Sequence, residues 1–128
     1  MAFDDLVAAT RSAVASRQRS APLRELRERT RSVPTARNVA SVLRAPGRVV
    51  SVIAEVKRAT ATFADLSGVG DVAVLARFYE AGGAACVSVV TEPVRSHGRL
   101  SDLDAVRGAV EVPVLANDVI VTPYQVHE

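Results

Sequence analysis

The sequence predicts an α/β protein in which a helical segment precedes a parallel sheet. Apolar residues recur at helical spacing up to about residue 43, and from residue 49 onward short β-branched runs alternate with helical stretches, as in parallel βα units. The length of 128 residues, with 48% hydrophobic and 23% charged residues, fits one modest core and excludes a disordered chain. We therefore expect a helical extension over residues 1–48 and three βα units over residues 49–128.

Three helices are expected in the extension. Residues 3–19 place their apolar side chains near one face, and a short apolar stripe follows Pro22 over residues 22–31. A third short helix is expected over residues 35–43, between Pro34 and a Pro-Gly pair.

The remainder of the chain predicts three strands separated by two helices. The strands are expected at 49–56, 84–90 and 112–116, the helices at about 71–81 and 100–110, and the first turn of a further helix at 123–128. We expect the first of these helices to place its apolar residues Val72, Leu75, Ala76 and Tyr79 on one stripe. We expect Ser101 or a neighbour to cap the second. Because near-continuous apolar strands are typical of parallel sheets covered on both faces, three such strands leave two unpaired edges, and we expect the sheet to be incomplete.

Charge is distributed unevenly along the chain. Residues 1–48 hold ten arginines against four acidic residues, whereas residues 49–128 hold six basic residues against ten acidic ones. The basic segment contains one aromatic residue, Phe3, and hence no platform on which bases could stack, so we do not expect nucleic-acid binding. No apolar run reaches the roughly 18 residues of a membrane span, and the start lacks the features of a secretory signal, so we expect no membrane partner and a cytoplasmic location.

Few side chains in the sequence are candidates for redox or metal chemistry. Cys86 is the single cysteine and lies within an apolar strand, so we expect a buried, unreactive thiol. His97 and His127 are expected to be solvated. No metal-ligand spacing is present, so we expect no metal site.

The pair Glu55 and Lys57 is the strongest candidate for chemistry. Two residues apart on a strand, they lie on the same side, and they fall at its carboxyl end, where active sites form in βα architectures. An acid beside an amine changes the proton affinity of both groups. Lys57 is also the only lysine among sixteen basic residues. The alternative is a structural ion pair at one end of a barrel, and spacing alone does not decide between the two.

Several motifs occur together in a specific order. They are VIAEVKRA at 52–59, YEAGGAACVSVVT at 79–91, Asp102-Leu103, VPVL at 112–115, Asp118 and PYQV at 123–126. Together they resemble the indole-3-glycerol-phosphate synthase family over nearly the whole chain. The resemblance implies part of a (β/α)8 TIM barrel, namely the amino-terminal helices and the first three strands. It also implies a cofactor-free reaction in which 1-(2-carboxyphenylamino)-1-deoxyribulose 5-phosphate, a small phosphorylated substrate, closes to an indole ring with loss of carbon dioxide and water.

The same resemblance assigns roles to individual residues. Lys57 would hold the substrate carboxylate and assist proton transfer, while Glu55 would orient Lys57 and share in a later proton step. Thr60 and Thr62 keep two hydroxyls of the family's substrate-binding loop after the first strand, although the proline and glycine of that loop are replaced. Asn117 occupies the position of the lysine that is taken to be the family's general acid.

Two departures from the family bear on activity. An amide such as that of Asn117 donates a hydrogen bond but delivers no proton, so the substitution should cost about 10²–10⁴ in rate. The resemblance also places the catalytic base and the phosphate-binding loops on strands four to eight, which are not in this sequence. We therefore expect an inactive, truncated or degenerate member. The alternative is a non-catalytic half-barrel that binds a partner barrel or a complementing half, or self-associates, through its open strand edges.

Overall fold

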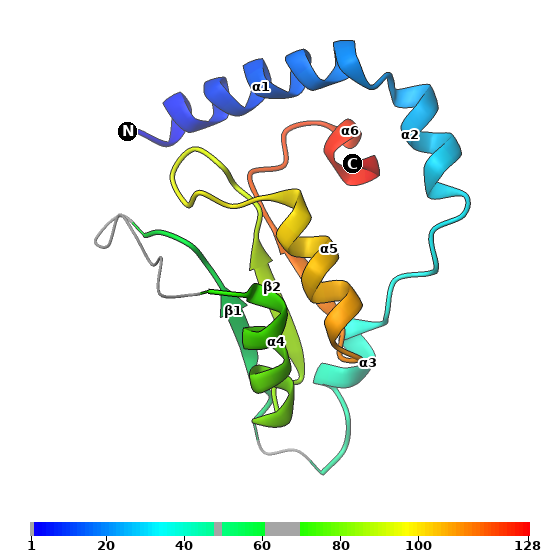
Figure 1. Ribbon diagram of the computed structural model, residues 1–128, viewed down its shortest axis with the longest axis vertical. Helices are drawn as coiled ribbons and strands as arrows, with labels where there is room; N and C mark the ends of the chain where they lie inside the picture. Colours follow the sequence, from blue (N-terminus) through cyan, green and yellow to red (C-terminus); the bar gives the residue numbers. More distant parts are fainter. Residues whose placement is uncertain (1, 48–49, 61–69) are drawn as a thin grey trace. The chain divides into compact units, whose positions relative to one another are not determined.

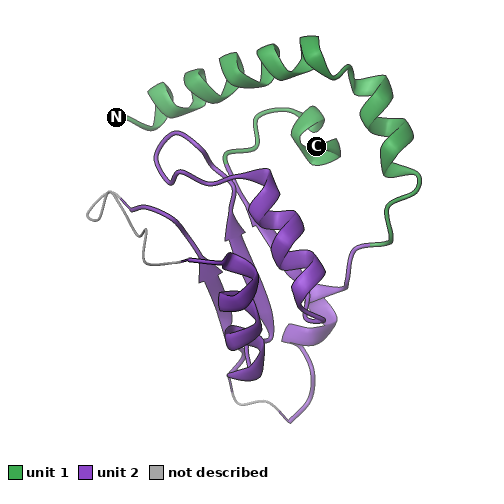
Figure 2. Ribbon diagram, in the orientation of Figure 1, with its two compact units in different colours: residues 1–35, 119–128 green, residues 36–118 purple. Residues whose placement is uncertain are grey.

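The computed structural model describes residues 2–47, 50–60 and 70–128. The described elements follow the order helix, helix, helix, strand, helix, strand, helix, strand, helix (Figure 1). They are α1 (Phe3–Ser20), α2 (Leu23–Thr30), α3 (Val39–Leu43), β1 (Ile53–Val56), α4 (Val72–Ala81), β2 (Cys86–Val90), α5 (Leu100–Ala109), β3 (Val114–Asn117) and α6 (Pro123–His127). The chain forms two compact units, residues 1–35 with 119–128 and residues 36–118 (Figure 2).

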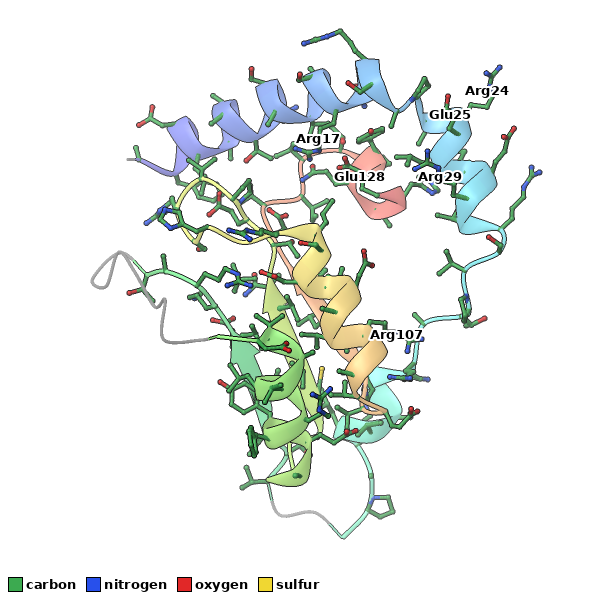
Figure 3. The ribbon with its side chains drawn as sticks, in the orientation of Figure 1. Arg17, Arg24, Glu25, Arg29, Arg107 and Glu128 are labelled. Atoms are coloured by element: carbon green, nitrogen blue, oxygen red, sulfur yellow. The ribbon has the colours of Figure 1, made fainter. Side chains whose placement is uncertain are left out.

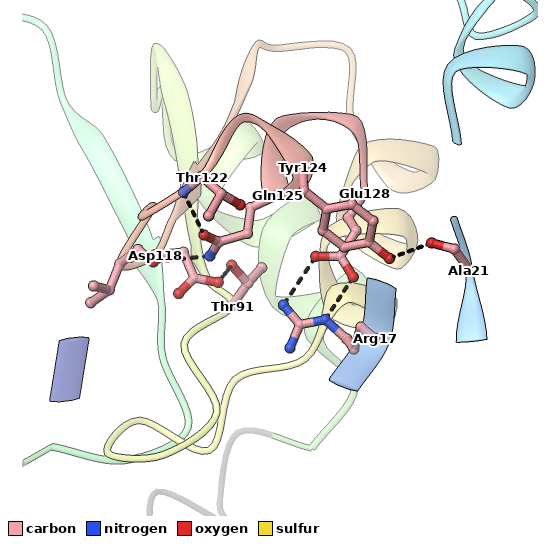
Figure 4. Close-up of polar contacts among 9 residues, drawn as sticks. Arg17, Ala21, Thr91, Asp118, Thr122, Tyr124, Gln125 and Glu128 are labelled. Atoms are coloured by element: carbon pink, nitrogen blue, oxygen red, sulfur yellow. Dashed lines mark hydrogen bonds and ion pairs between the residues drawn. The ribbon is translucent and has the colours of Figure 1, made fainter. Parts of the chain in front are cut away.

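The first unit packs α1, α2 and α6 around a small apolar cluster. Its buried members are Val14, Leu26 and Tyr124, one from each helix. The Tyr124 hydroxyl donates a hydrogen bond of 2.9 Å to the carbonyl of Ala21, where α1 ends (Figure 4). A buried tyrosine needs such a partner for its hydroxyl, so this bond fixes α6 against the end of α1.

Some of the arginines in the first unit are engaged in ion pairs. Arg17 on α1 binds both carboxylate oxygens of Glu128, at 2.6 and 3.0 Å (Figures 3 and 4). On α2, Arg29 lies 3.9 Å from Glu25 one turn away, while Arg24 is exposed (Figure 3). Acidic side chains within the unit thus neutralise part of the basic charge of its helices.

The second unit contains a three-stranded parallel sheet with the order β1-β2-β3. Helices α4 and α5 pack against the sheet and against each other. The core between helices and sheet consists of small and β-branched side chains, of which Val56, Val72, Ala76, Val87, Val89, Val106 and Val110 are buried. The expected stripe on α4 is confirmed, since Leu75 and Tyr79 also pack against this core.

The amino-terminal end of the sheet is closed by polar contacts. The Glu80 carboxylate, near the end of α4, accepts hydrogen bonds from the backbone amides of Glu111 and Val112 at 2.8 and 2.9 Å. The Arg37 guanidinium donates to the carbonyls of Val110 and Val112 and pairs with the Glu111 carboxylate at 3.3 Å. These contacts fasten the turn that leads from α5 into β3.

The α/β prediction with parallel strands is confirmed, and the arrangement is consistent with part of a (β/α)8 barrel. Several details of the prediction are wrong. The second and third strands each begin two residues later than predicted, at Cys86 and Val114. The third helix begins at Val39 rather than near Thr35, because the Asn38 side chain accepts a hydrogen bond from the Ser41 amide and so starts the helix there. No side chain caps α5, whose first residue follows Arg99, and Ser101 lies inside the helix.

The first strand is also shorter than predicted. It begins at Ile53, opposite Cys86, the first residue of β2, so β1 starts where its partner strand starts. Val50 and Val52 precede the strand and are exposed. Position 49 lies outside the described residues. None of the helices in the described part of the chain is long and apolar enough to cross a membrane.

Candidate active site

Glu55 and Lys57 form an ion pair at the carboxyl end of β1. The Lys57 Nζ atom lies 2.8 Å from Glu55 Oε1, and about one third of each side chain is exposed. The two residues are brought together by strand alternation, which places positions 55 and 57 on the same side of the chain. The prediction that Glu55 and Lys57 lie on the same side at the carboxyl end of the strand is confirmed.

The third strand contributes Asn117 to the same group. Its side-chain Nδ2 donates a hydrogen bond of 2.9 Å to Glu55 Oε2, so the two oxygens of the carboxylate bind neighbours from opposite edges of the sheet. Ser88 lies directly across from Glu55 on the strand between them, and its side chain also helps to lower the pKa of the carboxyl. Glu55 is therefore held by groups from all three strands.

These contacts set the protonation state of Glu55. Partial burial by itself would raise the pKa of the carboxyl, but hydrogen bonds from Lys57 and Asn117, the positive charge of Lys57 and the hydrogen bond with Ser88 together hold that pKa below its ordinary value. Glu55 is thus an anion at neutral pH. Because an ammonium group can donate three hydrogen bonds, Lys57 can bind an anion while remaining paired with Glu55.

Two more polar contacts follow the carboxyl end of β2. The Thr91 hydroxyl donates to the Asp118 carboxylate at 2.8 Å, which joins the residues that follow β2 and β3 (Figure 4). Glu92 is buried, and its carboxylate accepts hydrogen bonds from the backbone amides of Val94, Arg95 and Ser96. A carboxylate that accepts three amides fixes the start of this loop.

A partly buried ion pair lies beside Lys57 in the sequence. The Arg58 guanidinium donates to both carboxylate oxygens of Asp102, from Nε at 2.6 Å and from Nη2 at 2.7 Å. These two parallel hydrogen bonds are the strong, directional form of an arginine–carboxylate contact, and they raise the pKa of Arg58. It links the segment that follows β1 to the first turn of α5.

Of the five predicted site residues, the structure brings together Glu55, Lys57 and Asn117. Thr60 is partly buried, three residues beyond Lys57, and Thr62 lies outside the described residues. The roles assigned to all five stay predictions.

The three other candidates are Cys86, His97 and His127. Cys86 is fully buried, as predicted, and burial raises the pKa of its thiol. His97 is exposed, as predicted, whereas His127 is half-buried. Within residues 2–47, 50–60 and 70–128, no group of three or more His, Cys, Asp or Glu side chains could hold a metal ion.

Sequence reasoning missed Ser88 and the Arg58–Asp102 pair as parts of this region. Ser88 was available as a signal, because it is the one polar residue inside the apolar run 84–90. The contact between Arg58 and Asp102 joins residues 44 positions apart, so no local pattern indicates it.

Comparison with known proteins assigns the chain to a family. The family model "Indole-3-glycerol phosphate synthase" matches residues 3–128. Three proteins described as indole-3-glycerol phosphate synthase are similar to the chain, from Mycolicibacterium smegmatis at 48% identity, Mycolicibacterium gilvum at 47% and Mycobacterium avium at 46%. Each match covers 98% of this chain and 46% of the relative, so the chain spans about half the length of the relatives it matches. The parallel βα sheet has an acid–amine pair at its carboxyl end, and the family model matches the chain over residues 3–128. The chain therefore belongs to the indole-3-glycerol phosphate synthase family.

Proposed function

We propose that Glu55, Lys57 and Asn117 form the part of a synthase active site contributed by the first three strands. The substrate would be 1-(2-carboxyphenylamino)-1-deoxyribulose 5-phosphate, and the reaction a cofactor-free ring closure with loss of carbon dioxide and water. The observation that carries this proposal is the ion pair of 2.8 Å at the carboxyl end of β1, with Asn117 bound to the same carboxylate. In parallel βα folds this end of the sheet is where substrates bind.

In this proposal Lys57 binds the substrate carboxylate and assists proton transfer. The partly exposed ammonium group of Lys57 offers an anion both charge and hydrogen bonds, and the ion pair with Glu55 holds that ammonium group in place. Glu55 is ionised and can accept a proton in a later step. Thr60 and Thr62 would add hydroxyl contacts to the substrate.

Asn117 limits what the site can do. Its amide donates to Glu55, and it has no proton to transfer to the ketone oxygen when the ring carbon attacks. The removal of a positioned general acid costs about 10²–10⁴ in rate. We therefore propose that the polypeptide 1–128 by itself has little or no turnover.

The test has two arms. Purified 1–128 is incubated with the carboxyphenylamino substrate, and indoleglycerol phosphate is measured; we expect none. In the second arm, 1–128 is joined to the part of the M. smegmatis synthase that it does not match, and Asn117→Lys and Lys57→Ala are compared with the unmodified fusion. We expect Asn117→Lys to raise turnover by about 10²–10⁴ and Lys57→Ala to abolish it.

Two results would contradict the proposal. Turnover by 1–128 that disappears in Lys57→Ala would show that residues 1–128 already suffice. A fusion whose rate is unchanged by both substitutions would show that neither position takes part in the chemistry.

The second candidate is a non-catalytic half-barrel that binds a partner barrel, a complementing half or another copy of itself. The observation that favours it is the exposure of large apolar side chains on the two outer strands, with Ile53 on β1 46% exposed and Leu115 on β3 45% exposed. Unpaired strand edges bearing such side chains favour pairing with another chain.

Sedimentation velocity at tens of micromolar tests this candidate. We expect 1–128 to self-associate and the double variant Ile53→Lys/Leu115→Lys to shift toward monomer, because lysine on an edge strand opposes pairing. A matched control, Phe78→Lys, removes an apolar side chain that is 70% exposed on α4 and should leave association unchanged. A sharp monomer peak for the unmodified chain would contradict the candidate.

A further inference from the structure

Lys57 lies one residue beyond the part of β1 that the sheet holds. The last paired residue of β1 is Val56, which lies opposite Val89, so no strand register fixes the direction of the Lys57 side chain. A four-carbon side chain in that position has many rotamers available. Alternation places Lys57 on the side of Glu55 only while the backbone continues the line of the strand, so the ion pair depends on what holds the segment after Val56.

The two residues after Lys57 supply that restraint. Val56 points away from the side that carries Glu55, because side chains alternate along a strand. Arg58 lies at a bend just after the strand, and its contact is with α5, which packs on the face of the sheet that buries Val56. Val56 is buried in the core against the helices, and Arg58 forms its two hydrogen bonds with Asp102. Ala59 is fully buried. With positions 56, 58 and 59 fixed, Lys57 can face only the side of Glu55.

Asp102 is itself firmly placed. Its side chain is 8% exposed and sits in the first turn of α5, where the helix dipole favours a carboxylate. The loop before α5 is held by the three hydrogen bonds that backbone amides donate to the Glu92 carboxylate. It is also held by the close packing of Gly98, where a Cβ would overlap the carbonyl oxygen of Val90. Arg58 is thus attached to a rigid part of the unit.

We infer that Arg58 and Asp102 are positioning residues, which hold Lys57 against Glu55 by fixing the backbone that follows β1. The importance of these two residues to the reaction rests on the proposed function of the Glu55–Lys57 site. Its test measures where the Lys57 amine lies and involves no turnover, so its failure and a failure of the proposed function are separate results.

The test uses the single lysine. An amine-selective acylating reagent can modify only Lys57 and the chain's amino terminus, and mass spectrometry of peptides separates the two. Labelling rates of Lys57 are measured at one pH in the unmodified chain, Glu55→Gln, Asp102→Asn and the double variant. This is a double-mutant cycle, which isolates the coupling between the two positions.

We expect Glu55→Gln to raise Lys57 labelling about threefold in the presence of Asp102, the size expected for a partly exposed ion pair. In the Asp102→Asn background we expect the same substitution to change labelling by less than about 1.5-fold, because Lys57 no longer stays beside Glu55. A purely structural role for Asp102 would lower stability and leave the coupling intact.

The control is Glu111→Gln, which removes the partner of Arg37 at the opposite end of the sheet and should leave both the Lys57 rate and its coupling unchanged. Far-UV circular dichroism checks that each variant is folded. If Asp102→Asn loses its fold, Arg58→Lys replaces it, since lysine keeps the charge but cannot form the two-point contact.

Two outcomes would overturn the inference. One is an undiminished Glu55–Lys57 coupling in folded Asp102→Asn or Arg58→Lys. The other is Lys57 labelling in the unmodified chain that Glu55→Gln does not change, which would mean that the amine is not held against Glu55 at all.

Discussion

The central strand and its two neighbours differ sharply in burial, although all three are rich in apolar residues. Every residue of β2 is buried, including the polar Ser88 at 4% exposure. On β1 only Val56 is buried, and on β3 none of the four residues is. Ile53 and Leu115, both larger and more apolar than serine, are nearly half exposed.

The difference shows that position in the sheet, more than side-chain hydrophobicity, determines burial in this unit. A central strand has a partner strand on each side and helices on one face, so even its polar side chains are shielded from water. An outer strand keeps one edge open to water. The candidate site uses this arrangement. Glu55 and Asn117 lie on the more exposed outer strands, where a ligand could reach them, and Ser88 lies between them at the protected centre.

The largest effect should come from placing a charge in the centre of the sheet. Val89 is fully buried in the core, and Val89→Asp puts an unpaired carboxylate there. We expect a loss of about 4 kcal/mol or more in the free energy of unfolding, enough to abolish the cooperative transition. Urea unfolding at low micromolar concentration, followed by circular dichroism, measures it.

The matched variant for that experiment is Leu115→Asp on the outer strand. With nearly half of this side chain already in water, we expect a change within about 0.5 kcal/mol. Equal destabilisation by the two variants would mean that β3 is as well covered as β2 and that the comparison does not hold.

A smaller effect is expected from Ser88→Ala. The substitution leaves the strand packed but removes the hydroxyl that helps to lower the pKa of Glu55. We expect about 1 kcal/mol of destabilisation and a rise in the pKa of Glu55, since a donor to the charged form is lost. Carboxyl NMR titration reads the pKa, and Ser101→Ala on α5 serves as the control. A Glu55 pKa that does not move would assign Ser88 to packing alone.

The smallest effect concerns pH. The pKa of Glu55 is lowered in the folded chain, so its contribution to stability is fully present above its unfolded pKa of about 4.3 and is lost as the pH falls through the lower folded value. Because the side chain is about one third exposed, solvent screening keeps this contribution to a few tenths of a kcal/mol.

The measurement compares urea unfolding of the unmodified chain and Glu55→Gln at pH 7 and near pH 3. We expect the difference in stability between them to shrink at the lower pH. A difference that stays constant across this range would show that the ionised form of Glu55 makes no special contribution.

Local patterns in the sequence determined much of the second unit. The strand and helix order, the buried stripe on α4 and the pairing of Glu55 with Lys57 all follow from spacing, because alternation and helical periodicity act over a few residues. The ends of the helices and strands were predicted less accurately than their order. β1 begins at Ile53 because its partner strand begins there, which no property of residues 49–52 indicates.

Only the tertiary structure decided which distant groups complete the candidate site. The hydrogen bond from Asn117 to Glu55 spans 62 positions, and the contact of Arg58 with Asp102 spans 44. Both depend on strand register and on the placement of α5, which are set by the packing of the whole unit. A sequence specifies which side chains can form such bonds, but the folded sheet determines which of them meet, since a one-residue change in register would turn each strand's side chains to the other face.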